Sequence, residues 1–346
     1  MLTHTELFMR RGACCTTLWR KHLQRAMTTN ATAPSRRAPV VELLDGGTGE
    51  ELFKRGLQDD RKVWSASALV HETHHELLSF LAAGADFITC NNYGVTPGVG
   101  FSEVDIVKLT VVAGALANEA RRRSGRKDAK ICGSLPPLLE SYRADKVVEY
   151  NEGVHLYSVI GSALLPHVDL YLAETLSSVV EAKMVLVGVQ DYQKPAMVSF
   201  ALNSQGKIRS GECVDDAVNE LLHFVTFTVP KLSLHGILFN CSQPEDVSKA
   251  LRALNAASET KARLAERGVR LGAYANRLTE IPDDWALQES AKPQAMRNDL
   301  DVQRYTDFVM EWIELGAEIV GGCCGIGPEY ISSVHKRLAE QGLRQR

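Results

Sequence analysis

From residue 40 onward, short apolar runs rich in β-branched residues alternate with longer segments of helical periodicity. Such alternation is typical of βα units, which build parallel sheets. The runs predicted to be strands are 40–44, 86–90, 130–133, 168–173, 196–201, 236–240, 269–274 and 318–321. The segments predicted to be helices lie near 65–83, 104–123, 145–164, 177–188, 214–225, 245–266, 302–315 and 328–341.

Eight consecutive βα units favour one closed barrel, with a doubly wound sheet as the alternative. The length of 346 residues is compatible with two domains, but equally with a single barrel that carries insertions and tails. We therefore predict an α/β protein with one (β/α)8 TIM barrel over residues 40–342. Residues 1–39 are predicted to be a separate N-terminal extension.

Polar side chains follow the predicted strands directly, at the point where each strand ends. In chain order they are Asp45, Asn91, Ser134, Glu174, Asn203, Cys241, Asn276 and Cys323. In a barrel of parallel strands the carboxyl ends meet at one rim, where enzymes of this fold build their active sites. The candidate site is therefore expected at this rim.

The adjacent Cys323 and Cys324, within Ile-Val-Gly-Gly-Cys-Cys-Gly, suit a metal better than a disulfide. Neighbouring Cα atoms lie about 3.8 Å apart, which is closer than a relaxed disulfide prefers. Cys241 supplies a third thiol from another strand end. Three soft sulfur ligands favour Zn²⁺ and leave one coordination position open. Cys132 and Cys213, in contrast, are predicted to be buried packing residues.

A second metal motif is present, because His71-Glu72-Thr73-His74-His75 matches the metalloprotease pattern H-E-x-x-H. The motif falls in the helical segment between the first two predicted strands. In a barrel this helix lies outside, away from the catalytic rim. No third ligand has a suitable spacing, so these histidines are predicted to belong to an ordinary helix face.

Charge and composition limit the possible partners. The net charge of −3 shows no excess of basic residues, so nucleic-acid binding is not favoured. No apolar run approaches the length of about 20 residues that a membrane span needs. The expected partners are therefore small molecules. The eight cysteines lack the regular spacing of a disulfide framework, which favours a reducing compartment, most simply the cytoplasm.

Residues 1–39 differ in composition from the rest of the chain. They contain several arginines among many threonines, with Glu6 as the single acidic residue. This composition is typical of a mitochondrial transit peptide. A disordered tail, or initiation at Met27, are the alternatives.

Several segments together resemble the homocysteine S-methyltransferase family. The matching residues are 44–47, 49–52, 63–66, 83–89, 133–137, 174–175, 198–200, 240–241 and 321–325. The resemblance covers nearly all of residues 41–336. It implies a (β/α)8 barrel enzyme that transfers a methyl group to the thiol of homocysteine and produces methionine.

The resemblance also implies roles for individual residues. Cys241, Cys323 and Cys324 correspond to the zinc ligands. Asp45, with Gly46 beside it, and Glu174 correspond to the residues that bind the amino end of homocysteine. Asn276 matches an asparagine that can approach the zinc when homocysteine is absent. The zinc would activate the substrate thiol, so no general base is expected.

The methyl donor is less closely specified by the resemblance. The chain ends about twenty residues after the cysteine pair, without counterparts of the cobalamin and folate modules or of the C-terminal arm of betaine-using members. This short architecture implies S-methylmethionine as the donor, or S-adenosylmethionine. Two departures bear on substrate contacts: Cys90 replaces a usual threonine, and Tyr274-Ala275-Asn276-Arg277 replaces the usual Tyr-Pro-Asn-Ser.

Two other functions are compatible with the residues alone. A zinc hydrolase would use the open coordination position for an activated water. Three thiolate ligands make zinc a weak Lewis acid, which counts against this alternative. A non-catalytic zinc or redox protein on a barrel scaffold is the other alternative.

Overall fold

The computed structural model describes residues 40–57, 64–70, 75–282, 285 and 294–344. The chain divides into two units, Met1–Pro39 and Val40–Arg346, and the fold is that of the second unit. The predicted extension 1–39 and residues 71–74 of the H-E-x-x-H motif lie outside the described residues. Both expectations therefore stay predictions.

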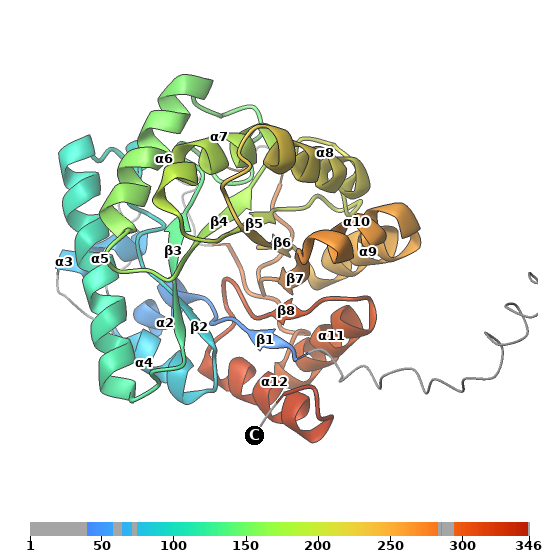
Figure 1. Ribbon diagram of the computed structural model, residues 1–346. Coiled ribbons are helices and arrows are strands. Elements are labelled where there is room, and N and C mark those ends of the chain that lie inside the picture. Colours follow the sequence, from blue (N-terminus) through green and yellow to red (C-terminus); the bar gives the residue numbers. More distant parts are fainter. Residues whose placement is uncertain (1–39, 58–63, 71–74, 283–284, 286–293, 345–346) are drawn as a thin grey trace, which may run out of the picture. The chain divides into compact units, whose positions relative to one another are not determined.

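The strands form one parallel sheet that curves into a barrel (Figure 1). Their bounds are β1 Glu42–Leu43, β2 Phe87–Thr89, β3 Lys130–Leu135, β4 Leu170–Leu176, β5 Ala196–Phe200, β6 Leu234–Asn240, β7 Arg270–Tyr274 and β8 Ile319–Val320. Each strand from β2 to β8 pairs with the next, and β8 pairs in parallel with β1. The pairing of the last strand with the first confirms the predicted TIM barrel and excludes the doubly wound sheet.

The seam between β1 and β2 is closed largely by carboxylates. The Asp86 N–H donates to the Leu43 carbonyl at 2.7 Å, and the Asp86 carboxylate accepts from the Leu43 N–H at 2.9 Å. At the carboxyl end, the Asp45 carboxylate accepts from the Thr89 N–H at 2.6 Å. Asp45 therefore joins the two strands at the rim where the candidate site was predicted.

Helices surround the sheet (Figure 1). Their bounds are α2 Thr48–Lys54, α3 Ser67–Val70, α4 His75–Ala82, α5 Glu103–Ser124, α6 Tyr150–Leu164, α7 Val179–Val189, α8 Val214–Phe227, α9 Pro244–Ala256, α10 Ser258–Arg267, α11 Val302–Glu314 and α12 Pro328–Glu340. Capping residues determine where many of these helices begin and end. The Ser102 hydroxyl accepts from the Asp105 N–H at the start of α5, and Gly125 ends that helix in a left-handed conformation.

Two helical segments differ from the prediction. The segment 245–266 is two helices, because the chain leaves helical geometry at Ala257 between α9 and α10. The short helix α2 was not predicted. It has Glu50 and Glu51 in its first turn and Lys54 in its last, which complements the helix dipole, and it buries Leu52.

The strands β3 and β4 are longer than predicted, and this moves two site residues. Ser134 and Glu174 were expected in loops, but both belong to strands. β4 shifts register against β5 after Ala173 and regains pairing at Leu176. The strand therefore continues through Glu174, which lies at the irregular step between Ala173 and Leu176.

The inside of the barrel is a small apolar cluster, which includes Phe87, Cys132, Leu172, Met197 and Ile319. A larger core lies between the strands and the surrounding helices. Cys132 is fully buried, as predicted. Cys213 is exposed, which contradicts the prediction, because it is the residue that precedes α8 and its thiol faces outward. Among the described helices, none combines the length and the apolar character required to cross a bilayer.

Candidate metal centre and substrate cavity

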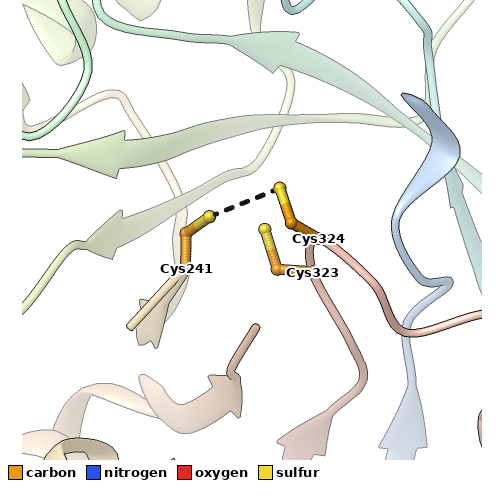
Figure 2. Close-up of side chains that lie close together, drawn as sticks. All are labelled: Cys241, Cys323 and Cys324. Atoms are coloured by element: carbon orange, nitrogen blue, oxygen red, sulfur yellow. Dashed lines mark hydrogen bonds between the residues drawn. The ribbon is translucent and has the colours of Figure 1, made fainter. Parts of the chain in front are cut away.

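The three cysteines converge as predicted at the carboxyl rim of the barrel. Cys241 follows β6, and Cys323 and Cys324 follow β8, and their thiols point toward one another (Figure 2). All three sulfurs lie within 4.8 Å of one another, with 3.8 Å between those of Cys241 and Cys324. A tetrahedral zinc with bonds of about 2.3 Å separates two sulfurs by about 3.8 Å. The donor set and its spacing therefore fit a metal ion of this kind.

The position of Cys241 depends on a strained backbone. Cys241 has a positive φ of 48°, which is uncommon for a residue with a side chain. Its N–H donates to the Tyr274 carbonyl at 3.2 Å, which fixes it to the end of β7. The Tyr142 hydroxyl lies 2.8 Å from its sulfur, and the Asn276 amide donates to that sulfur at 3.8 Å. These contacts turn the thiol toward Cys323 and Cys324.

The turn that carries Cys323 and Cys324 is tied to the ends of two neighbouring strands. The Gly322 N–H donates to the Asp45 carbonyl after β1, and the Cys323 N–H donates to the Ala275 carbonyl after β7, both at 2.9 Å. A Cβ on Gly322 would lie 2.2 Å from the Ile326 side chain, so only glycine fits there. The turn is thereby fixed before any ligand binds.

The three thiols do not share the same acidity. Hydrogen bonds from Cys323 and Cys324 hold the pKa of the Cys241 thiol well below its usual value. The same bonds to Cys241 raise the pKa of the thiols of Cys323 and Cys324. Cys241 is therefore the first of the three to become a thiolate.

The sulfurs open into a cavity of about 440 Å³, which Asp45, Gly46, Glu174 and all three cysteines line. Burial raises the pKa of Asp45 to about 7 and that of Glu174 to about 8. The Ser134 hydroxyl donates to Glu174 at 2.5 Å. In the described part of the chain, neither carboxylate forms an ion pair with a lysine or arginine. Two buried acids without a cation favour a positively charged ligand group.

Asn240 aligns Glu174 with the thiol cluster. Its side-chain oxygen accepts from the Thr175 N–H at 2.9 Å and from the Ser199 hydroxyl at 2.8 Å, and its amide donates to the Thr175 hydroxyl at 2.9 Å. Thr175 has a positive φ of 61°, so these bonds stabilise a strained residue directly after Glu174. One buried amide therefore fixes the ends of β4, β5 and β6 to one another.

The remaining predicted residues occupy less central positions. Gly46 lies where a Cβ would come within 2.1 Å of the Ile326 carbonyl oxygen, so its role is close backbone approach. Asn276 contacts Cys241 but lines a separate small cavity behind it. Cys90 lines the main cavity, and burial raises the pKa of its thiol far above the usual value. Cys90 is therefore a neutral thiol.

Four other residues at the site were not predicted from the sequence. One lies on a helix and three lie in loops, and no sequence motif or regular spacing identifies them. They are Glu50, Tyr142, Arg209 and Trp285. Tyr142 and Trp285 pack edge to face, with 5.4 Å between their ring centroids. A motif that includes Glu50 contributed to the family resemblance, but the motif assigned this residue no role.

Arg209 connects two loops that contribute Tyr142 and Ile281 to the cavity wall. It donates to the Tyr142 carbonyl at 3.2 Å, the Ile281 carbonyl at 3.3 Å and the Pro282 carbonyl at 3.1 Å. Its guanidinium also lies over the Tyr142 ring, 5.7 Å from the centroid. The loop after β3 and the loop after β7 are thus fixed to each other by a single side chain.

A parallel eight-stranded barrel with three converging thiols and two buried carboxylates at its carboxyl rim defines a class of barrel enzymes with a thiolate metal site. The family model for homocysteine S-methyltransferase matches residues 42–338. The chain belongs to this family. The resemblance found in the sequence motifs is thereby confirmed, and a hydrolase or a non-catalytic barrel is not supported.

Individual relatives agree with this assignment. The chain is 21% identical over 333 residues to homocysteine S-methyltransferase 2 of Arabidopsis thaliana, covering 86% of this chain and 93% of that protein. It is 29% identical over 295 residues to betaine-homocysteine S-methyltransferase of Drosophila melanogaster, covering 77% and 82%. The metallated form of the Escherichia coli homocysteine methyltransferase MmuM shares the fold, with a TM-score of 0.68, 23% identity, and coverage of 86% and 96%.

Proposed function

We propose that this protein transfers a methyl group from a sulfonium donor to the thiol of homocysteine, at a zinc ion held by Cys241, Cys323 and Cys324. The observation that carries the proposal is the convergence of three thiols and two uncompensated carboxylates on one cavity. Thiols suit a metal that binds sulfur, and carboxylates suit an amino group. Homocysteine contains both a thiol and an amino group.

Zinc is the metal proposed for the three sulfurs. The spacing of 3.8 Å between two of them supports a tetrahedral ion, and soft thiolates favour zinc over oxygen-preferring cations. When bound, zinc would lower the pKa of a substrate thiol that joined it as fourth ligand. The MmuM structure with this fold is described as metallated, which supports a metal in the present chain.

Asp45 and Glu174 are proposed to bind the ammonium group of homocysteine, with Gly46 leaving room beside Asp45. Asp45 follows β1 and Glu174 lies on β4, and the charge of Asp45 raises the cost of ionising Glu174. An ammonium between them would remove this repulsion. The same contact would orient the substrate thiol toward the cysteines, and Asn276 would keep Cys241 in place from behind.

The transfer itself requires little further chemistry from the protein. The bond between the donor sulfur and its methyl group breaks, and its electron pair remains on that sulfur. A new bond forms between the methyl carbon and the homocysteine sulfur, whose proton has passed to solvent. The protein contributes by holding the two sulfurs in line and by excluding water from the cavity.

The identity of the donor can be tested directly. We expect the zinc-loaded protein to form methionine from homocysteine with S-methylmethionine, and more slowly with S-adenosylmethionine. Betaine belongs in the same assay because the Drosophila relative is a betaine enzyme. Mass spectrometry with a labelled donor methyl group measures each product. If neither sulfonium transfers its methyl group, the proposed function is wrong, and transfer from betaine alone would make the protein a betaine-using enzyme instead.

The expected location is the cytoplasm, with mitochondrial import through residues 1–39 as the alternative. The Arg-rich and acid-poor composition of this segment supports the alternative. A fluorescent protein fused after residue 39 distinguishes the two, since import would concentrate the signal in mitochondria.

A further inference from the structure

A third carboxyl group lines the cavity in addition to those of Asp45 and Glu174. Glu50 lies in the first turn of α2, which begins directly after the glycine pair that follows β1. A Cβ on Gly47 would lie 2.7 Å from the Cys323 carbonyl oxygen and 3.1 Å from Glu50 Oε2. The Glu50 carboxyl group and the cysteine turn therefore meet on either side of the same glycine.

The Glu50 carboxyl group has no matching cation among the described residues. The carboxyl group interacts with the Cys324 thiol and the Gly325 N–H, but its Oε2 atom is shielded from solvent and has no hydrogen-bond partner there. Lys54 lies one helical turn further along α2 and also lines the cavity, but it interacts with Glu51 at 3.9 Å and with Glu329 at 3.5 Å. A shielded acceptor without a partner is unfavourable, so a positively charged ligand would compensate it.

A metal ion at the cysteines would not supply that compensation. Three thiolates carry three negative charges, which exceed the two positive charges of zinc. The site next to Glu50 would therefore remain negative after the metal binds. A cationic ligand in the cavity would supply the positive charge.

The other walls of the cavity indicate what kind of cation fits. Tyr142 and Trp285 present an aromatic wall, and Leu278, Ile281 and Met296 add apolar surface. A sulfonium carries its charge on sulfur and has no N–H or O–H bond to donate there. It is held by negative charge and by aromatic faces rather than by hydrogen bonds. A carboxyl oxygen that lacks a donor, within a largely apolar cavity, matches this chemistry.

We propose that Glu50 holds the positively charged sulfur of the methyl donor beside the Cys323–Cys324 turn. The inference rests on the proposed function and adds the residue that selects a cationic donor. The contact exists only before transfer, because the donor sulfur becomes a neutral thioether when its methyl group leaves. Glu50 thereby favours binding of the donor over retention of the demethylated product.

The test replaces Glu50 by glutamine, which removes the charge and keeps the shape. We expect the KM for S-methylmethionine to rise about ten- to hundredfold, since a charged contact in a shielded site is lost. Because part of the positive charge is still on the donor sulfur in the transition state, the contact stabilises the bound donor and the transition state alike, and kcat should change little. The KM for homocysteine and the zinc content should stay unchanged. Glu50→Asp, which keeps the charge, should give an intermediate donor KM.

Glu51→Gln is the matched control, because Glu51 is the next residue on α2 and pairs with Arg55 at 2.7 Å. This variant should leave the donor KM at the wild-type value. Calorimetry with trimethylsulfonium, which has a cationic sulfur but no amino or carboxyl group, measures the contact without turnover. Its affinity should fall about tenfold or more in Glu50→Gln.

Each contrary result has a separate meaning. If the wild-type protein uses S-methylmethionine but Glu50→Gln retains the wild-type donor KM and trimethylsulfonium affinity, the inference is wrong and the proposed function stands. Loss of zinc in Glu50→Gln would also overturn it, by making Glu50 a residue of the metal site. If the wild-type protein transfers no methyl group from any sulfonium, both proposals fail.

Discussion

Replacing Cys241 by alanine is expected to remove the bound metal and to reduce methyl transfer below detection. Cys241 provides one of three sulfurs in the cluster and is the thiol whose pKa is held lowest. Two remaining thiols do not make the three-ligand set that a catalytic zinc site requires. Elemental analysis and a methionine-forming assay on the same preparation measure both effects.

The exposed Cys213 offers a matched control for this experiment. Cys213→Ala removes a thiol that lies outside the cluster, so zinc content and activity should stay at the wild-type level. A full complement of zinc in Cys241→Ala would show that the ligand assignment is wrong. Circular dichroism of each variant identifies any loss of metal that results from unfolding.

Glu174→Gln is expected to raise the KM for homocysteine about ten- to hundredfold without loss of zinc, since a charged contact to the substrate ammonium is removed. In the wild-type protein the pKa of Glu174 is raised to about 8, mainly by burial. Its ionised form increases as the pH rises toward 8, so homocysteine should bind more tightly over this range. The variant should lose most of this pH dependence.

The same substitution has an expected effect on stability. The pKa of Glu174 is above its ordinary value of 4.5, so its neutral form is favoured in the folded state. The stability from this neutral form is complete below about pH 4.5 and is lost as the pH rises toward 8. The melting temperature of the ligand-free variant should therefore exceed that of the wild type by an amount that increases across this pH range.

Glu181→Gln is the control for the second prediction. Glu181 is also buried, and burial raises its pKa to about 7, but it lies on α7 and accepts from the Ser177 N–H at 2.7 Å. Its replacement should leave the KM for homocysteine unchanged. An unchanged homocysteine KM in Glu174→Gln would remove Glu174 from the substrate site, whereas loss of zinc would make it a metal-site residue.

The sequence allowed the thiol cluster to be predicted because strand order alone determines which residues share a rim. Cys241 and Cys323 lie far apart in the chain, yet Cys241 directly follows β6 and Cys323 comes shortly after β8. In a closed barrel, that placement suffices to bring them together. The family motifs then indicated Asp45 and Glu174, and both line the same cavity.

The residues that escaped prediction depend on tertiary packing. Glu50 reaches the cavity because α2 begins directly after a glycine pair, and Arg209 acts through carbonyl oxygens of two distant loops. Neither arrangement has a periodic pattern. The extension of β4 through Glu174 follows from a register shift against β5, which the composition of one strand does not reveal.

The contacts of Arg209 make the position of the rim loops independent of the side chains that these loops carry. Its three bonds to these loops go to backbone carbonyl oxygens, which every amino acid provides. Substitutions at Leu278, Ile281 or Met296 would change the cavity wall and leave these carbonyl acceptors present. A new donor preference could thus evolve, or be engineered, by exchange of wall residues on a scaffold whose loops keep their places.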